Sequence, residues 1–228
     1  MMIFGQELPS APRYRMRLTP LGRYGIRNLL AGQGHAVPVA GELAAADAAV
    51  LLDGLSVYDQ DSLSVELTGW IAERGEEGAV REILAVVPDT DPALAVRRFA
   101  AVTVLTMARP SDRGLDVLRE TAATGPDGRR HVAAGVLANL GEAPPSYRET
   151  LQPWLVIDTL SVLVATGLPD GLPPEILVAL RGNADDLWRC DHPATASTLE
   201  AIGSALRDTD KALAKQLRRA AHKARARS

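Results

Sequence analysis

The densest cluster of polar side chains in the sequence is the segment DDLWRCDH, residues 185–192. Asp185 and Asp186 are adjacent carboxylates, the type of ligand that Mg²⁺ prefers. Cys190 and His192 are residue types that bind zinc, but two ligands do not make a zinc site. An enzyme with an unrecognised carboxylate site at Asp185, Asp186 and His192 is therefore one hypothesis for the function.

The spacing within this segment argues against metal chemistry. Isoprenoid enzymes bind Mg²⁺ through a DDxxD motif, and the fifth position of that motif is Arg189 here. An aromatic content of 4% also offers few rings to stabilise the cations of such reactions. The simpler interpretation is a loop in which Asp191 or His192 caps a helix that begins at Pro193. We expect this loop, and we expect no cofactor.

Other catalytic motifs are missing from the sequence. It contains no GxxxxGK[ST] phosphate-binding loop and no GxSxG serine-hydrolase turn. The GQG at residues 32–34 lacks the third glycine of a dinucleotide-binding motif. The segment DQDSLSVE has Leu63 where a calcium loop needs an oxygen ligand. The missing motifs disfavour an enzyme, but the sequence does not decide whether the protein is one.

Positive charge is concentrated at the two ends of the chain. The net charge is -3, but residues 1–27 carry five arginines against one glutamate, and residues 209–228 carry seven Lys or Arg against one aspartate. Residues 28–208 hold 13 basic and 26 acidic residues, a net charge of -13. This distribution predicts either ends that fold back onto an acidic body or a contact site for an anion at the ends.

The predicted C-terminal helix, 210–225, separates its side chains onto two faces at 100° per residue. One face is apolar and carries Leu213, Leu217, Ala220 and Ala224. The opposite face carries Lys211, Lys215, Arg218, His222 and Arg225. These five side chains, with Arg13, Arg15 and Arg17 near the N-terminus, are the candidate contacts for an anion or a partner. The alternative is a docked helix whose basic face is solvated and whose cations suit the helix dipole.

The elements that must position these residues are predicted to be helices. Gly/Pro-rich breaks separate segments of helical periodicity, which are 20–33, 43–56, 61–74, 76–87, 91–108, 111–124, 128–140, 147–166, 173–181, 193–206 and 210–225. Only residues 13–18, RYRMRL, alternate as a strand does. We therefore predict an N-terminal extended segment, 1–19, and a single all-α domain, 20–228.

The segment YRMRLTPLGRYGIRNLL, residues 14–30, suggests the wing and last helix of a winged-helix DNA-binding module. Such a module needs a helix-turn-helix of roughly sixty residues before the wing. Thirteen residues precede Tyr14, so we do not expect a complete module. The remaining interpretations are a remnant strand or a chain trimmed from a longer protein.

Two segments share an internal pattern. DPALAVRRFAA, residues 91–101, and DGRRHVAAGVLANLG, residues 127–141, each have a valine five positions after an aspartate, at Val96 and Val132. They resemble the second helix of HEAT-type repeats, in which such valines and leucines enter the core. The resemblance implies a HEAT-like α-solenoid or an irregular right-handed array of helical hairpins. It also predicts that Val96 and Leu137 are buried.

The whole chain is also similar to uncharacterised all-helical proteins of high-GC bacteria. In that type, an LTPLGR.G.R..L segment precedes an acidic array rich in Ala and Leu. This chain has LTPLGRYGIRNLL at residues 18–30 and HPATASTLEAIGSALRDTDKALAK at residues 192–215. The resemblance implies the helical fold and supplies no activity.

We therefore expect a non-enzymatic protein-interaction or scaffold module whose partner is another protein. The alternative is a nucleic-acid-binding HEAT-like protein that uses the basic C-terminal helix, which the acidic middle of the chain disfavours. The longest apolar stretch, residues 155–168, is too short for a membrane span and contains Asp158. The first residues lack the apolar region of a signal peptide, so a cytoplasmic location is the default expectation.

Overall fold

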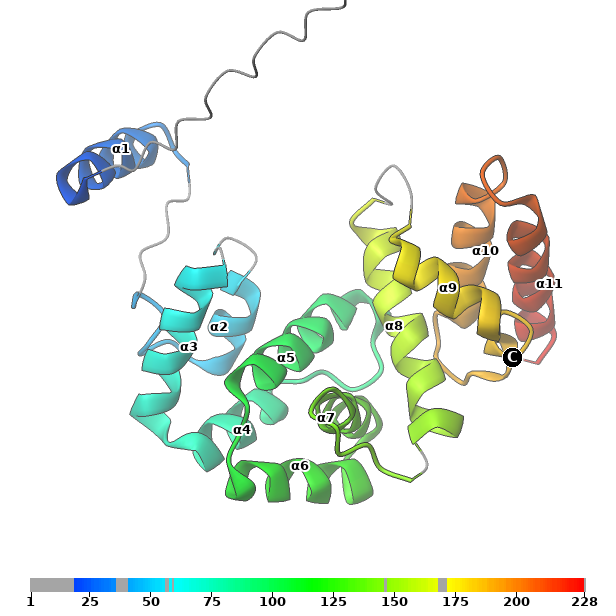
Figure 1. Ribbon diagram of the computed structural model, residues 1–228, viewed down its shortest axis with the longest axis horizontal. Helices are drawn as coiled ribbons and strands as arrows, with labels where there is room; N and C mark the ends of the chain where they lie inside the picture. The colour runs from blue at the N-terminus through cyan, green and yellow to red at the C-terminus, as the bar shows by residue number, and fades with distance from the viewer. Residues whose placement is uncertain are drawn as a thin grey trace, which may run out of the picture. The chain divides into compact units, whose positions relative to one another are not determined.

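The structure is a computed structural model that describes residues 19–35, 41–55, 58, 60–145, 147–167 and 172–227. The chain divides into two compact units, Met1–Val39 and Ala40–Ser228. Within the described residues there are eleven α-helices and no strand (Figure 1), which confirms the all-α prediction. Apart from Thr19, the predicted extended segment lies outside these residues, so the division at residue 19 stays a prediction.

The first unit contributes one described helix, α1 (Pro20–Gly32). Thr19 caps it, because its hydroxyl oxygen accepts the N–H of Gly22 at 3.1 Å. Pro20 occupies the first turn, where a missing N–H costs nothing. The LTPLGR segment therefore starts a helix at the proline, as the sequence predicts.

The second unit holds ten α-helices among its described residues, joined by short loops. They are α2 (Ala48–Gly54), α3 (Gln60–Arg74), α4 (Glu76–Ala85), α5 (Ala95–Ala108), α6 (Asp112–Thr124), α7 (Asp127–Asn139), α8 (Gln152–Ala165), α9 (Pro174–Asn183), α10 (Thr195–Ala205) and α11 (Lys211–Arg227). A π-helical turn, Tyr147–Leu151, leads into α8, and a 3-10 turn, Leu187–Arg189, follows α9. No described helix is long and apolar enough to cross a membrane.

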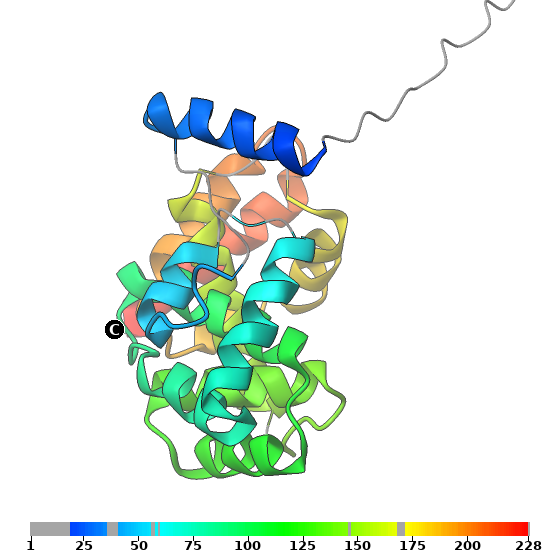
Figure 2. The same cartoon turned by 90° about the vertical axis from the view of Figure 1, so that its left-hand side faces the viewer.

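Two hydrophobic cores divide this unit. The first lies among α2 to α7 and includes Trp70 and Leu118. The second lies among α8 to α11 and includes Ile157 and Leu199. Helix α8 contacts α5 and α7 on one side and α10 on the other, while α10 and α11 lie side by side (Figures 1 and 2). The two cores therefore meet along α8.

The first core is closed by a loop that α3 holds in place. The buried carboxylate of Glu66 accepts the backbone N–H groups of residues 41–43, at 3.1 Å for Glu42 and 2.9 Å for Leu43. Trp70 donates its indole N–H to the carbonyl of Ala46 at 2.8 Å. These bonds give hydrogen-bond partners to the buried carboxylate of Glu66 and to the buried indole of Trp70. They also pair backbone groups of the loop, which has no helical hydrogen bonds of its own to satisfy them.

The HEAT-type alignment places one of its two test residues correctly. Leu137 is 1% exposed, which confirms its predicted burial, but Val96 is 51% exposed, so its predicted burial is wrong. In α5 the buried face begins with Ala95 and Arg98 instead. The reason is the partner of Arg98: its guanidinium turns inward to a carboxylate on α8, and this rotates Val96 outward.

Leu137→Ala tests the first core. Removal of a buried leucine side chain should cost roughly 2–5 kcal/mol. Val96→Ala is the matched control, because truncation at an exposed position should change stability by less than about 0.5 kcal/mol. Urea denaturation followed by circular dichroism measures both variants. Equal losses in the two variants would contradict this placement of the core.

Candidate functional site

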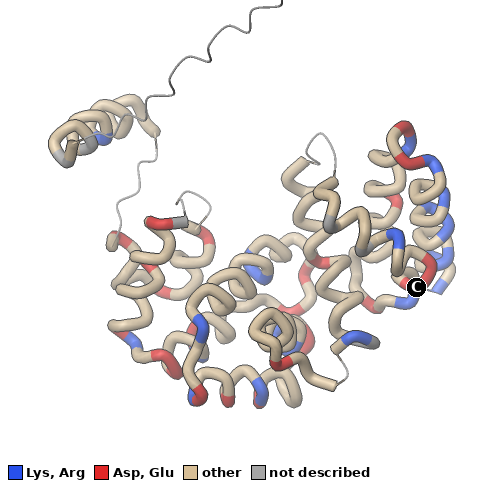
Figure 3. The backbone as a smooth tube through the Cα atoms, viewed as in Figure 1, with Lys and Arg blue, Asp and Glu red and all other residues tan. Residues whose placement is uncertain are grey.

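The basic face of α11 is exposed as the sequence predicts. We use this name for Lys211, Lys215, Arg218, His222 and Arg225, all of which are exposed. The apolar residues predicted for the opposite face, Leu213, Leu217, Ala220 and Ala224, are buried. Helix α11 carries no carboxylate of its own, and Figure 3 shows Lys and Arg following one another along it. Arg13, Arg15 and Arg17 lie outside the described residues.

Local contacts fix α11 against its neighbours. The Asp210 carboxylate accepts the N–H of Leu213 at 3.0 Å and pairs with Arg181 at 2.8 Å. The backbone hydrogen bond, followed by Arg181, holds the pKa of Asp210 below its ordinary value. A Cβ at Gly203 of α10 would lie 2.9 Å from Cγ of Arg218. The glycine therefore lets α10 and α11 approach closely, and α11 presents its cations from a rigid support.

Within the basic face, one side chain forms an ion pair with a described residue. Arg225 lies 3.6 Å from the Glu200 carboxylate of α10. At 55% side-chain exposure this pair contributes little to stability. Cations four residues apart on one helix, such as Lys211 and Lys215, repel each other by a few tenths of a kcal/mol. The charges of this face therefore contribute little to the packing of α11.

A cleft of about 1180 Å³ lies at the C-terminal end of α11. We call it the arginine cleft, because its lining includes Arg119, Arg130, Arg148, Arg189 and Arg227. Three carboxylates also line it, those of Glu142, Asp186 and Asp191. Glu142 pairs with Arg119, and Asp186 pairs with Arg189. Five guanidinium groups against three carboxylates leave the lining with a net charge of +2.

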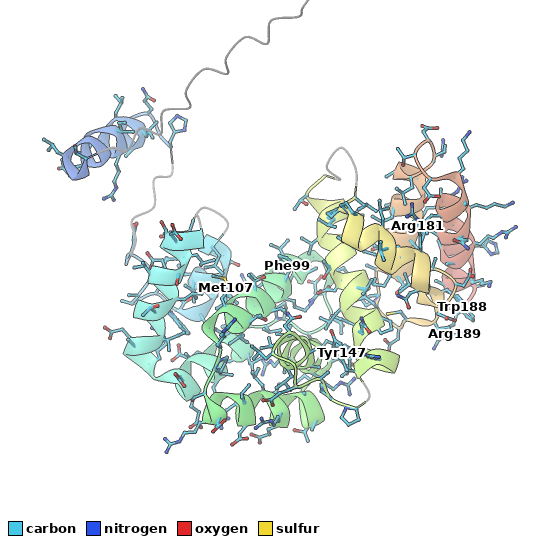
Figure 4. The ribbon with its side chains drawn as sticks, viewed as in Figure 1. Phe99, Met107, Tyr147, Arg181, Trp188 and Arg189 are labelled. Atoms are coloured by element: carbon cyan, nitrogen blue, oxygen red, sulfur yellow. The ribbon has the colours of Figure 1, made fainter. Side chains whose placement is uncertain are left out.

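Trp188 connects the arginine cleft to the surface of α11. The Arg189 guanidinium lies 5.1 Å from the centre of the Trp188 ring, and the Lys223 ammonium lies 5.5 Å from it. Figure 4 shows Trp188 and Arg189 together beside the end of the chain. Arg227 also donates a hydrogen bond to the carbonyl of Arg189. Positive charge thus continues from α11 to the rim of the cleft.

The residues Asp185, Asp186 and His192, grouped as a hypothetical enzyme site, do not share one. Asp185 is exposed, Asp186 pairs with Arg189, and the His192 side chain is buried. His192 accepts the N–H of Ala194 through Nδ1 at 3.0 Å, in the turn before α10. The predicted cap of a helix that begins at Pro193 is wrong, because α10 begins at Thr195 and its N-cap, Ala194, has no side-chain hydrogen bond. No group of three or more potential metal ligands occurs among the described residues.

His192 has no nitrogen left for catalysis. Because Nδ1 accepts a hydrogen bond, Nε2 carries the proton and donates it to Asp158 at 3.1 Å. Both ring nitrogens are therefore occupied in the neutral imidazole. Burial also raises the pKa of the neighbouring Cys190 thiol, which disfavours the nucleophilic thiolate.

The carboxylate that meets His192 belongs to a buried ion pair. Arg98 on α5 binds both oxygens of Asp158 on α8, at 2.6 and 3.0 Å. Its third nitrogen donates to the carbonyls of Asp89 and Asp91, at 3.0 Å each. Burial alone would raise the pKa of Asp158, but hydrogen bonds from His192 and Arg98 outweigh it and hold the pKa below its ordinary value.

Aromatic rings complete this cluster, which we call the polar joint: Arg98, His131, Trp154, Asp158 and His192. The rings of His131 and Trp154 stack at 4.2 Å, and the edge of His192 meets Trp154 at 4.4 Å. His131 Nδ1 lies 2.5 Å from the carbonyl of Asp127, so Nδ1 carries the proton. Burial lowers the pKa of His131 and favours its neutral form. The polar joint links α5, α7 and α8 to the segment before α10.

A smaller, largely apolar groove of about 300 Å³ borders the polar joint. Phe99, Tyr147, Leu155 and Ile176 line it, and Arg98 and Asp158 also contribute to its wall. Figure 4 shows Phe99 on α5 and Tyr147 at the turn before α8. Burial raises the pKa of Tyr147, so its hydroxyl stays protonated.

Comparison of the chain with protein-family models, with curated proteins and with solved structures finds no match. The geometry of its own residues is therefore the basis for assigning a function.

Asp158→Asn tests the polar joint. The substitution keeps the shape of the side chain but leaves the Arg98 guanidinium buried without a counter-charge, which should cost about 3–5 kcal/mol. Asp53→Asn is the matched control, because Asp53 pairs with Arg97 at the surface, where such a pair is worth about 0–1 kcal/mol. Urea denaturation compares the variants, and similar small losses in both would contradict the role of the joint.

The lowered pKa of His131 predicts a pH dependence of stability. Between that pKa and about 6.5, the unfolded chain binds a proton that the folded chain does not, so stability falls as pH falls below about 6.5. His131→Phe keeps a ring against Trp154 and removes the titration. Urea denaturation between about pH 7 and pH 5 should show a smaller decline in the variant. An unchanged decline would contradict the assignment.

Proposed function

We propose that the chain is a non-enzymatic protein-interaction module that binds an acidic partner protein through the basic face of α11. The observation that supports this most directly is the exposure of five basic side chains on one face of a docked helix. Of these, Arg225 alone forms an ion pair with a described residue, and that pair is long and exposed. An acidic partner surface would supply the missing counter-charges.

Several arginines elsewhere in the second unit, unlike most cations of the basic face, form ion pairs within the molecule. Arg81, Arg97 and Arg181 each pair with a nearby carboxylate on their own or a neighbouring element. Such pairs neutralise charge within the molecule. Arg109, Arg113 and Arg148 also form no ion pair with a described residue, but they are not gathered on one helix. The clustering of exposed cations on one face of α11 is the reason to assign its charges to an external contact.

Nucleic acid is the second candidate partner, because phosphates would also pair with this face. The net charge of -13 over residues 28–208 weighs against it. Over a Debye length of about 8 Å at physiological salt, that charge repels a DNA backbone that approaches the acidic body. We therefore place an acidic protein first.

The test compares two triple variants of the full chain. Lys211, Lys215 and Arg218 are replaced by Gln in the first, and the exposed Arg81, Arg109 and Arg113 are replaced by Gln in the control. The probe is fluorescent poly-glutamate, measured by anisotropy at about 150 mM salt. The first variant should bind at least about tenfold more weakly than the control.

Duplex DNA is measured in parallel with the same variants. Submicromolar DNA binding by the wild type that the first variant loses would favour the nucleic-acid alternative. Equal weakening of poly-glutamate binding in both variants would contradict a specific role for α11. Circular dichroism checks that both variants remain helical.

A further inference from the structure

The arginine cleft has features that the contact on α11 does not explain. It is recessed, with a volume of about 1180 Å³, whereas the basic face is the outer surface of a helix. Its arginines come from α6, α7, the turn Tyr147–Leu151, the turn Leu187–Arg189 and the end of α11. Five separate elements therefore direct cations toward one hollow.

Three of these arginines keep donors that no described residue uses. Arg130 pairs with Asp127 through Nη2 at 2.6 Å, but its Nε is buried without a hydrogen-bond partner. The Arg148 guanidinium is exposed and has no side-chain partner among the described residues. Arg227 donates to a single backbone carbonyl. The Nε of Arg130 is enclosed by the protein, so the donors open to a ligand are those of the exposed Arg148 and Arg227.

His131 adds an acceptor to the same lining. Its Nδ1 donates to the carbonyl of Asp127, which leaves Nε2 as an unprotonated nitrogen. The residue is 4% exposed, lines the cleft, and makes no second hydrogen bond to the described part of the chain. A ligand that fills the cleft can therefore meet the guanidinium donors of Arg148 and Arg227 and one neutral acceptor.

We propose that the arginine cleft binds a small molecule that carries a phosphate group. Phosphate oxygens match the forked donors of guanidinium groups, and a phosphate dianion can be shared by arginines that approach from different elements. Glu142 and Asp186 already supply carboxylates, and each of them occupies a single cleft arginine. The volume of about 1180 Å³ lies slightly above the range of about 300–1000 Å³ typical of small-molecule pockets, so a ligand larger than inorganic phosphate fits the cleft. His131 Nε2 accepts a hydroxyl or N–H of the remainder of the ligand.

This proposal is independent of the partner-binding role of α11, because it rests on other residues. The test uses the full chain and titration calorimetry with inorganic pyrophosphate as the probe. The wild type should bind pyrophosphate with a Kd below about 1 mM. Arg148→Gln combined with Arg227→Gln should weaken this binding at least about tenfold.

The matched control is Arg109→Gln combined with Arg113→Gln, which removes two exposed arginines that line neither the cleft nor the basic face. It should bind pyrophosphate as the wild type does. Equal weakening in the two double variants would show a general charge effect and would overturn the proposal, as would an absence of wild-type binding. Citrate is titrated as a carboxylate probe. Citrate binding as tight as that of pyrophosphate would overturn the assignment of a phosphate group.

Discussion

One buried ion pair, between Arg98 and Asp158, fixes how the two hydrophobic cores meet. Both side chains are almost fully enclosed, at 0% and 4% exposure. Removing two charges from water is costly, and the cost is offset only when the remaining donors and acceptors are also satisfied. Here Arg98 also donates to the carbonyl of Asp89, and His192 donates to Asp158. The geometry of α5 relative to α8 is therefore tightly specified.

A glycine at the start of α7 allows the backbone to pack closely around the ion pair. A Cβ at Gly128 would lie 2.1 Å from the carbonyl oxygen of Asp89 and 2.4 Å from that of Pro88. Only glycine allows α7 to begin this close to the loop, and the Asp89 carbonyl is one of the acceptors of Arg98. On the other side, His192 joins Asp158 to the start of α10, against which α11 packs. The position of the basic face thus follows from contacts made deep inside the molecule.

The sequence-based predictions that are confirmed, the helices and the two faces of α11, depend on local sequence patterns. Helical periodicity and Gly/Pro breaks depend on residues a few positions apart, and so does the two-faced character of α11. The ion pair joins residues 60 positions apart, and no periodicity encodes such a distance. One signal for it was present, namely Asp158, a charge within the most apolar predicted helix. Val96 was misplaced for the same reason, because the rotation of α5 is set by the distant partner of Arg98.

The polar joint also gives the two hollows of the second unit a common wall. Arg98 and Asp158 line the apolar groove, and His131 lines the arginine cleft. His131 stacks on Trp154, which in turn meets His192. Any ligand that touches His131 therefore contacts the cluster that sets α8 and α10. Since Arg98, Asp158 and His192 are buried and hydrogen-bonded to one another, the joint resists small displacements, and this rigidity keeps the cleft arginines of α7 and α11 at a fixed separation. The positions of the cleft arginines at the surface therefore depend on the buried ion pair between Arg98 and Asp158.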